Sequence, residues 1–188
     1  MSDKHTVRII GGKYKGKLLP VRNAEGLRPT PDRVKETVFT WLQNDIENAS
    51  VLDLFAGSGA LGFEALSRGA ANITLVELDY HSFRLLCDQA NSFDEKEKIH
   101  IINNDAIKYL DNCKEKFDVV FLDPPYKAHL LKPVLKLLLN NNIISDNTLL
   151  YVEMSTGDNE SIAGYEKIKE QIAGQAKYSL WKKSSFIF

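Results

Sequence analysis

The stretch "VLDLFAGSGALG", residues 51–62, decides the fold. It begins as an apolar, strand-like run that contains Asp53, and it then turns through three small residues, Gly57, Ser58 and Gly59. A helical pattern opens at Ala60. Glycine lets a backbone approach a ligand closely, and the first turn of a helix presents unpaired N–H groups to it. The stretch therefore predicts a strand–turn–helix unit with a ligand at the carboxyl end of its strand.

The chain beyond this unit continues to alternate. Strand candidates lie at residues 51–55, 73–79, 99–103, 117–122 and 148–153, with helical patterns at 60–68, 81–93, 107–113 and 132–141. The strands are nearly continuous apolar runs, which is typical of a parallel sheet covered on both faces. Two further strand candidates after Gly164 indicate an antiparallel hairpin at the sheet edge. The pattern predicts a Rossmann-like, doubly wound α/β fold with a mostly parallel sheet of seven strands.

The N-terminal end differs in character. Residues 7–21, "VRIIGGKYKGKLLPV", favour a small hairpin that turns at Gly11 and Gly12 and carries alternating lysines in its second arm. A helix is expected next, with Thr30 as its cap and Pro31 as its first residue. Residues 1–35 carry a net charge of +6, so the remainder carries −7 of the total of −1. This asymmetry suggests that the N-terminal end meets a polyanion. We divide the chain into a basic extension at residues 1–29 and one α/β domain at residues 30–188.

Composition bounds the class of protein. The chain has 188 residues, of which 44% are hydrophobic and 26% charged, as in an ordinary globular domain. The apolar runs are far shorter than a membrane span, and the N-terminus does not resemble a signal peptide, so we expect a cytoplasmic protein. Cys87 and Cys113 have no metal-ligand spacing around them, and the four histidines are scattered. We therefore expect reduced thiols and no metal.

The glycine turn allows two cofactors. Residues 57–62 satisfy G-x-G-x-x-G, and Glu77 lies 20 residues beyond Gly57, where a dinucleotide-binding protein places its ribose-binding acid. A nicotinamide dehydrogenase is therefore one interpretation. Asp53 favours S-adenosylmethionine instead, because a carboxylate repels a pyrophosphate but attracts an ammonium or sulfonium.

Asp53 lies inside the first strand, and acids recur at the ends of the next three: Glu77 after the second, Asp105 after the third and Asp123 after the fourth. In a parallel sheet the carboxyl ends of the strands line one crevice, which is the general ligand site of such folds. We expect Glu77 to accept hydrogen bonds from both ribose hydroxyls and Asp105 to accept one from the adenine amino group.

The segment "DPPY", residues 123–126, suits methylation of an amine. The lone pair of a base's exocyclic amine is delocalised into the ring, so the amine is a poor nucleophile. Hydrogen bonds from that NH₂ to Asp123 and to the Pro124 carbonyl would favour a pyramidal nitrogen and hold it for in-line attack. The two prolines stiffen these acceptors, and Tyr126 can stack on a base swung out of its helix or loop.

The same segment matches [DNS]-P-P-[FYW], the signature of S-adenosylmethionine-dependent amino-methyltransferases. Together with "RIIGGKYKGKLL", "GLRPTPDRVKETVFTWL", "DLFAGSGALGFEALSRGA", "VELD" and "AGQAKYSLW", it resembles the RsmD family. Members of that family methylate the N2 amine of a guanine in 16S ribosomal RNA. The similarity runs almost from end to end, with the blocks in the family's order.

The resemblance implies a class I methyltransferase domain and assigns its functional residues. Cofactor contacts are assigned to Asp53, Phe55, Gly57, Ser58, Gly59, Glu77, Asp105 and Ala106. Contacts with the target guanine are assigned to Asp123, Pro124, Pro125 and Tyr126. Contacts with RNA are assigned to Arg8, Lys13, Lys15, Lys17, Arg28 and Arg33. Family members vary between Asn and Asp at position 105, so the adenine contact rests more on its place at a strand end.

The implied cofactor is S-adenosyl-L-methionine, which becomes S-adenosyl-L-homocysteine, with no metal. The implied partner is 16S rRNA, within a partly or fully assembled small ribosomal subunit, and we expect a monomer with no membrane contact. Three alternatives remain open: a nicotinamide dehydrogenase that uses "GSGALG", a DNA amino-methyltransferase, and an inactive RNA-binding assembly factor. Residues 127–188 leave little room for the target-recognition region of a DNA enzyme, and an inactive factor need not retain Asp123 and Tyr126.

Overall fold

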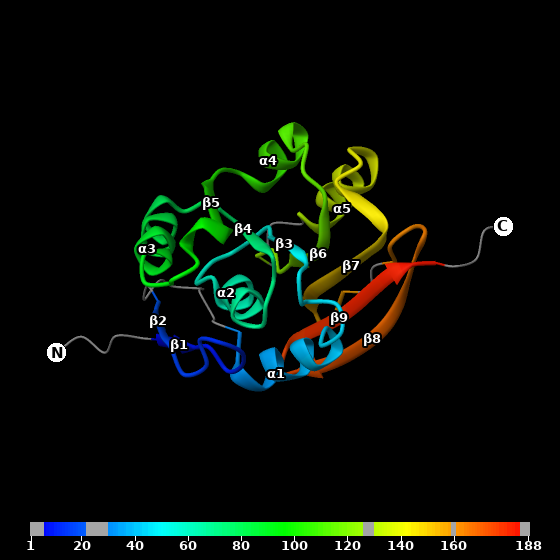
Figure 1. The fold of residues 1–188 in the computed structure, drawn as a ribbon. Coiled ribbons are helices and arrows are strands. Elements are labelled where there is room, and N and C mark those ends of the chain that lie inside the picture. The colour runs from blue at the N-terminus through cyan, green and yellow to red at the C-terminus, as the bar shows by residue number, and fades with distance from the viewer. Residues whose placement is uncertain (1–5, 22–29, 126–129, 159–160, 185–188) are drawn as a thin grey trace.

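The computed structural model describes residues 6–21, 30–125, 130–158 and 161–184 (Figure 1). One sheet of seven strands, in the order β5-β4-β3-β6-β7-β9-β8, passes through the centre of the molecule. Five neighbouring strands are parallel: β5 (Ile99–Asn103), β4 (Asn72–Glu77), β3 (Ser50–Asp53), β6 (Phe117–Leu122) and β7 (Ile144–Ser155). At one edge β9 (Ala176–Lys183) and β8 (Tyr165–Ala173) join them in antiparallel pairing. The predicted fold class is confirmed.

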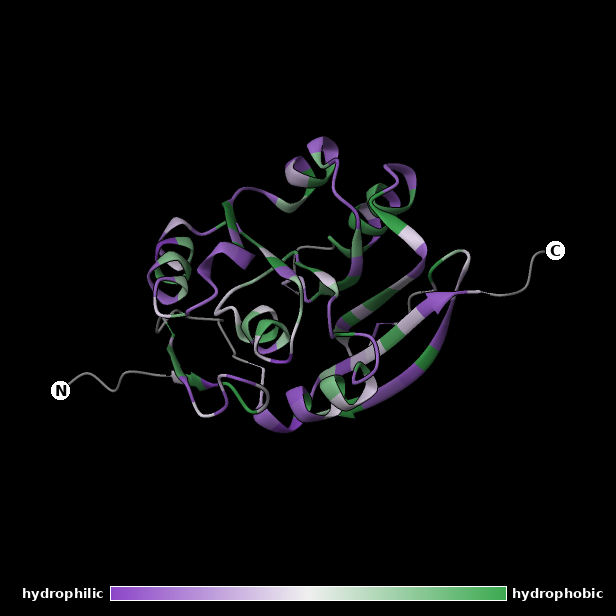
Figure 2. Ribbon diagram, viewed as in Figure 1, coloured by the Kyte–Doolittle hydropathy of each residue, from purple (hydrophilic) through white to green (hydrophobic). Residues whose placement is uncertain are grey.

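Helices cover both faces of this sheet. One face carries α1 (Asp32–Trp41), α2 (Ala60–Ser67) and α3 (Tyr80–Ala90), and the other carries α4 (Ala106–Asn112) and α5 (Leu131–Asn140). A short 3-10 turn, η1 (Lys96–Lys98), precedes β5. Alternate residues of β6 divide between the layers: Val119 and Phe121 join the core under α1–α3, and Val120 and Leu122 the core under α4 and α5. Burial on both faces explains why the central strands are so hydrophobic (Figure 2).

The strand order reverses beside β3. The chain passes from β3 through α2 to β4 and through α3 to β5, and it then returns through α4 to β6 on the other side of β3. In open α/β sheets, ligands bind outside the carboxyl ends of the strands at such a reversal. The ends of β3 and β6 therefore mark the expected ligand crevice.

The N-terminal hairpin packs against the first helix layer. Its strands, β1 (Thr6–Arg8) and β2 (Leu18–Pro20), are antiparallel, and Ile9 and Leu19 are buried in the core under α1–α3. The hairpin is confirmed, but its strands are shorter than predicted. The lysines lie in the connecting residues 9–17 and do not alternate along a second strand, because this connection follows the surface of α2.

The connection crosses the C-terminal end of α2 closely. The backbone N–H of Lys13 donates to the Ser67 carbonyl at 2.7 Å. Gly12 has a φ of +72°, and a Cβ at this position would lie 1.8 Å from the Ser67 carbonyl oxygen. Only glycine permits this approach.

Glu64 fixes the hairpin to α2. Its side chain is fully buried, with Oε2 accepting from the Ile10 N–H at 2.8 Å and Oε1 accepting from the Gly11 N–H at 2.9 Å. The Arg68 guanidinium donates to Oε1 at 2.7 Å and balances the charge. A buried carboxylate with three donors is a specific connection between the N-terminal extension and α2.

The start of α1 differs from the prediction. Pro31 is the N-cap and not the first helical residue, since its φ of −60° and ψ of 148° are extended and its carbonyl accepts from the N–H groups of Val34 and Lys35. Thr30 is therefore not the cap. The first turn is stabilised instead by Asp32, which accepts from the buried Lys35 ammonium at 3.0 Å.

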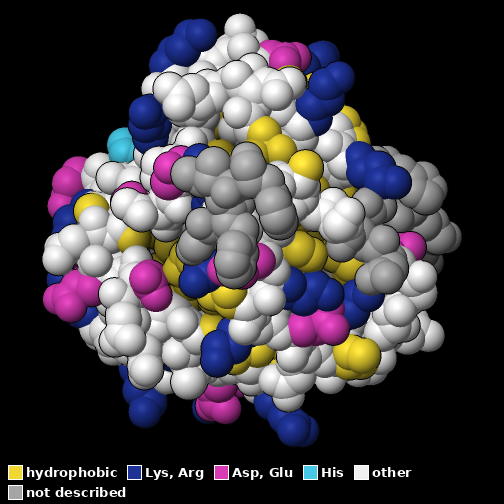
Figure 3. Space-filling view, turned by 90° about the vertical axis from the view of Figure 1, so that its right-hand side faces the viewer, with side chains coloured by type: hydrophobic (Ala, Val, Ile, Leu, Met, Phe, Trp, Pro, Cys, Tyr) yellow, Lys and Arg dark blue, Asp and Glu magenta, His cyan; other side chains and the backbone are white. Residues whose placement is uncertain are grey.

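Strand β8 is last in the sheet order and exposes Ile168 and Ile172. Figure 3 views the molecule from this side and shows hydrophobic side chains among charged side chains of both signs. Within the described ranges, no helix is long and apolar enough to cross a membrane.

Candidate active site

The register of the parallel strands brings acids onto one face of the sheet. Asp53 is paired with Leu75 of β4 and with Phe121 of β6, and paired residues of parallel strands point to the same face. Glu77 follows Leu75 by two residues and Asp123 follows Phe121 by two, so both return to that face. Asp53, Glu77 and Asp123 thus lie at the carboxyl edge of the sheet, on the side of α1–α3. The structure brings these three predicted residues together.

A further carboxylate, Glu153, belongs to the same row and was missed in the sequence. Phe121 is paired with Tyr151 of β7, and their rings meet edge to face with centroids 5.8 Å apart. Glu153 follows Tyr151 by two residues, and the Tyr151 hydroxyl donates to Glu153 Oε2 at 3.0 Å. Position 153 ends a predicted strand, but the strand order that places β7 beside β6 cannot be read from the sequence.

Glu77 holds the glycine turn in place. Its Oε2 accepts from the Gly57 N–H at 2.8 Å and its Oε1 from the Asp79 N–H at 2.7 Å. Gly57 has a φ of +53°, and a Cβ there would find no atom nearer than the Phe55 carbonyl oxygen at 4.0 Å. The turn is therefore shaped by glycine and leaves open space beside it. Ser58 is buried, and Gly59 is the N-cap of α2.

Asp53 is buried between this turn and β4. Only 3% of its surface is exposed, and Oδ2 accepts from the Gly62 N–H at 3.2 Å. Burial raises the pKa of Asp53 to about 7, and repulsion from Glu77 acts in the same direction, against hydrogen bonds from the Gly62 and Phe55 N–H groups. A cation placed beside Asp53 would relieve the unfavourable burial of its negative charge.

Asp123 shares this environment at the end of β6. The residue keeps some exposed surface, but burial of its carboxyl group raises its pKa well above the usual range, and repulsion from Glu153 and Asp53 adds to the shift. Pro124 is buried and Pro125 is exposed. Tyr126 lies outside the described residues.

The residues assigned to adenine lie beside β5. Asp105 is the N-cap of α4, with Oδ1 accepting from the Ile107 N–H at 3.0 Å and the Lys108 N–H at 3.1 Å. Ala106 is buried, and Phe55 is half-buried against the core under α4 and α5. Asp105 thus has a structural role as a helix cap, and its contact with adenine stays a prediction.

The site fits S-adenosylmethionine. Acidic side chains gather at the carboxyl ends of the central strands, the pKa of Asp53 is raised, and the turn at Gly57 leaves open space. These features suit a ligand that carries cationic groups and hydroxyls, and they oppose a pyrophosphate. Among the described side chains, no group of three His, Cys, Asp or Glu residues is placed to hold a metal ion.

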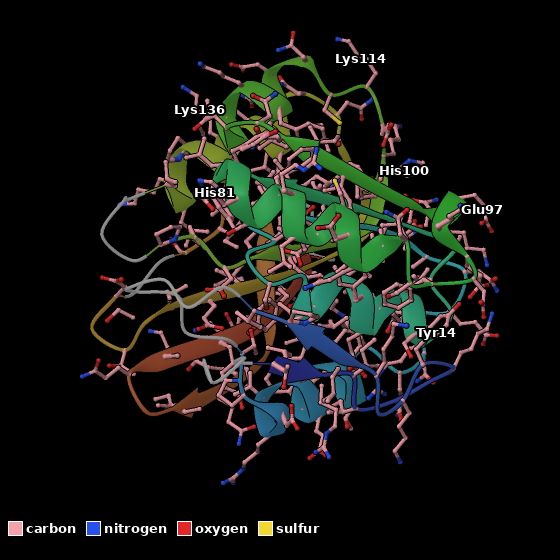
Figure 4. The ribbon with its side chains drawn as sticks, turned by 90° about the vertical axis from the view of Figure 1, so that its left-hand side faces the viewer. Tyr14, His81, Glu97, His100, Lys114 and Lys136 are labelled. Carbon is pink, nitrogen blue, oxygen red and sulfur yellow. The ribbon has the colours of Figure 1, made fainter. Side chains whose placement is uncertain are left out.

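The basic residues lie apart from this crevice. Lys13 pairs with Glu95 at 3.0 Å, and Lys17 donates to the Ser92 carbonyl at 2.7 Å, with its ammonium 4.7 Å from the Phe93 ring centroid. Residues 92–95 lie between α3 and β5, at the amino ends of the strands. In Figure 4, Tyr14 accordingly lies on the side of Glu97 and His100, opposite His81 in the first turn of α3.

One of the predicted arginines, Arg8 of β1, contacts the first turn of α1, and another, Arg33, belongs to that turn. Arg8 donates to Asp32 at 2.9 Å, and Arg33 is exposed in the same turn. Lys15 is exposed between Lys13 and Lys17. Arg28 lies outside the described residues.

Comparison with known proteins identifies the family. The model of the family described as "Conserved hypothetical protein 95" matches residues 7–182. Ribosomal RNA small subunit methyltransferase D of Escherichia coli strain K12 is 40% identical over 181 residues, which cover 95% of this chain and 91% of the relative. The protein of the same name from Haemophilus influenzae is 42% identical over 184 residues, covering 95% of each. The chain belongs to the RsmD family.

A solved structure agrees with the membership in the RsmD family. The putative methyltransferase yhhF from Escherichia coli is 37% identical and superposes with a TM-score of 0.88, covering 97% of this chain and 100% of that one. As an RsmD family member, the chain is a methyltransferase that depends on S-adenosylmethionine. This membership rules out the nicotinamide dehydrogenase that the glycine turn alone allowed.

Proposed function

We propose that the protein transfers a methyl group from S-adenosylmethionine to the N2 amine of a guanine in 16S rRNA of the small ribosomal subunit. The observation that carries the proposal is the position of Asp123 and Pro124, which follow β6 directly at the reversal of strand order. The RNA substrate is supported by relatives named ribosomal RNA small subunit methyltransferase D. The enzyme acts as a cytoplasmic monomer on a partly or fully assembled subunit.

The cofactor, when bound, supplies an electrophilic methyl group on a sulfonium. Asp53 faces its cationic groups, and Glu77 accepts from the ribose hydroxyls while keeping Gly57 in its turn. Ser58, Gly59 and Phe55 complete the contacts around the glycine turn. Asp105 and Ala106 border the adenine.

Asp123 and the Pro124 carbonyl accept the two N–H groups of the target amine. These acceptors favour a pyramidal nitrogen whose lone pair points at the methyl carbon, and the two prolines keep them rigid. Tyr126 stacks on the extruded guanine. Arg8, Lys13, Lys15, Lys17, Arg28 and Arg33 contact the surrounding RNA backbone.

The test uses small-subunit RNA and particles from a strain that lacks this protein. Asp123→Ala removes an acceptor that acts mainly at the transition state, so single-turnover methyl transfer should fall by about a hundredfold or more while RNA binding changes little. Asp118→Asn, at an exposed position on the same strand, is the matched control: it removes a charge, keeps an oxygen that can accept from the Ser50 N–H, and should retain the wild-type rate. DNA of the same sequence tests the DNA alternative. Wild-type rates in Asp123→Ala, with 2-methylguanosine still formed, would overturn the mechanism.

A further inference from the structure

Glu153 lies next to Asp123 across two paired strands. The register aligns Leu122 of β6 with Val152 of β7, so the following residues, Asp123 and Glu153, occupy adjacent positions at the two strand ends. Neighbouring strands are about 4.8 Å apart. The edge-to-face contact between Phe121 and Tyr151 shows that the side chains of this alternation point to the same face. The Glu153 carboxylate therefore faces the Asp123 carboxylate.

Tyr151 fixes the Glu153 side chain in this place. Its ring is fully buried between Phe121 and Tyr178, and its hydroxyl donates to Glu153 Oε2 at 3.0 Å. The structure thus holds the Glu153 carboxyl group beside the amine-binding acid, and the half-buried Glu153 remains in reach of solvent.

We propose that Glu153 is a positioning residue for amine methylation: held by Tyr151 beside Asp123, its carboxylate enables Asp123 to take the proton that the amine loses. This inference rests on the proposed function. In the reaction, the amine nitrogen bonds to the methyl carbon as the carbon–sulfur bond breaks, and the electron pair of that bond stays on sulfur. The nitrogen then releases one N–H proton to Asp123, which passes it to water at the crevice.

The charges around Asp123 account for this role. A lone aspartate is a weak base near neutral pH, and a general base works best when its pKa lies near the working pH. Glu153 and Tyr151 face Asp123 from β7, and Asp53 faces it from β3, with Glu77 beyond Asp53 on β4. Tyr178 of β9 lies behind Tyr151. Of these neighbours, Asp53 meets the cationic cofactor, so Glu153 is the one that keeps its effect on Asp123 once the cofactor is present.

The test separates Glu153 from the rest of the site with two variants. Glu153→Gln removes the charge and keeps the size, and Glu153→Asp keeps the charge. Glu170→Gln, on the distant strand β8, is the control. Titration of ¹³C-labelled aspartate carboxyl groups by NMR measures the pKa of Asp123 in each protein without any RNA. Single-turnover methyl transfer is measured in the same proteins from about pH 5 to about pH 9, because a general base works best when its pKa lies near the working pH.

Glu153→Gln should lower the pKa of Asp123 by about one unit, as expected for removal of a charge a few ångströms away at a partly solvated site. The acid limb of the rate profile should move down in pH by the same amount, and the plateau rate should fall severalfold because Asp123 becomes a weaker base. Glu153→Asp and Glu170→Gln should keep the wild-type acid limb.

An unchanged Asp123 pKa in Glu153→Gln would overturn the inference, and so would a shifted pKa that the rate profile does not follow. A role of Glu153 in packing alone would lower the rate at every pH without moving the acid limb. Failure of the proposed function looks different, since the wild-type protein would then transfer no methyl group to RNA while the titration of the Asp123 carboxyl group still differed between variants.

Discussion

A carboxyl group buried as deeply as that of Asp53 responds to any charge placed beside it. Its pKa of about 7 in the folded protein lies above the ordinary value near 4, so the folded state binds more protons than the unfolded state between these values. The contribution of Asp53 to stability is therefore present below pH 4 and is lost as the pH rises towards 7. A cationic ligand reverses this loss by favouring the ionised form.

Binding of S-adenosylmethionine should consequently release protons from Asp53. At pH 6 most Asp53 carboxyls are protonated, so binding should release close to one proton, and at pH 9 it should release almost none from this residue. Calorimetry in buffers of different ionisation enthalpy measures the number released. Asp53→Asn should abolish the difference between the two pH values, whereas a wild-type binding heat that is independent of buffer at pH 6 would contradict the assignment.

We propose two tasks for Glu77. Glu77→Ala would remove the proposed acceptor for the ribose hydroxyls, together with the carboxylate that accepts from the Gly57 and Asp79 N–H groups. Hydrogen bonds to a charged group contribute about 1.5–3 kcal/mol, so the dissociation constant for the cofactor should rise tenfold or more. Calorimetric titration below the melting temperature measures it. Unchanged affinity in a folded Glu77→Ala protein would remove Glu77 from the cofactor site.

Individual site residues could be predicted where an acidic residue follows an apolar, strand-like run in the sequence. Asp53, Glu77 and Asp123 each follow an apolar run, and parallel strands bring such positions to one edge. Glu153 was not predictable in this way, because its importance depends on β7 lying beside β6. Glu64 was also missed, since an acid in the middle of a helix resembles a solvated residue until a hairpin from a distant part of the chain covers it.

At the scale of elements, the contact between the hairpin and α2 depends on Glu64. Glu64→Ala would leave the Arg68 guanidinium and the N–H groups of Ile10 and Gly11 without their acceptor. Breaking a buried ion pair from one side costs about 3–5 kcal/mol, so the free energy of unfolding should fall by that order. Chemical denaturation measures this decrease.

Amide exchange locates the effect of the same substitution. Exchange at Ile10 and Gly11 should accelerate in Glu64→Ala more than exchange in β3 or β6, because the hairpin opens without the sheet. Glu36→Ala, an exposed position on α1, is the control and should change neither quantity. Uniform acceleration across the sheet would show instead that the hairpin and the sheet open together.

Element types were predicted better than element ends. The bounds of β5 and β6 agree with the prediction, because apolar runs stop abruptly at Asn103 and Leu122. β7 extends to Ile144–Ser155, well beyond the predicted 148–153, since pairing with β6 and β9 supports polar residues that no hydrophobic pattern would include. Thr30 was a reasonable cap, but the extended geometry of Pro31 lets that residue's carbonyl begin the helix.

At the scale of the whole molecule, the lysine-bearing connection of the hairpin (residues 9–17, the basic loop) lies at the amino ends of the strands. The ligand crevice lies at their carboxyl ends. A strand of six residues such as β6 is about 20 Å long, and about six base steps of a duplex cover that distance at 3.4 Å each. An RNA that reaches both Asp123 and Lys15 must span at least this length. Short oligonucleotides cannot do so.

Replacing Lys13, Lys15 and Lys17 together by alanine should weaken binding of small-subunit RNA. For every phosphate of single-stranded RNA that the loop no longer neutralises, the logarithmic salt slope should fall by about 0.7, while cofactor affinity stays the same. Affinity measured over a series of salt concentrations provides the slope. Lys13 and Lys17 also contact residues 92–95, so melting temperatures must accompany the binding data.

Lys15→Ala alone isolates the RNA contribution, since Lys15 is exposed at the same loop. This substitution should lower the logarithmic salt slope by about 0.7, the contribution of one phosphate, without changing the melting temperature. If the slope is the same in wild-type, single and triple variants, the loop contacts no RNA and its lysines serve the packing on α3.

The position of β9 between β7 and β8 sets the order in which the chain can mature on a ribosome. Tyr151 and Val152 of β7 are paired with Leu180 and Ser179 of β9, which are synthesised nearly thirty residues later. Until those residues leave the exit tunnel, β7 has an open edge whose N–H and C=O groups can pair with any passing strand. A nascent chain interrupted before residue 176 therefore exposes the unpaired edge of β7, a strand of the core sheet. Such fragments are expected to be bound by chaperones and degraded by proteases.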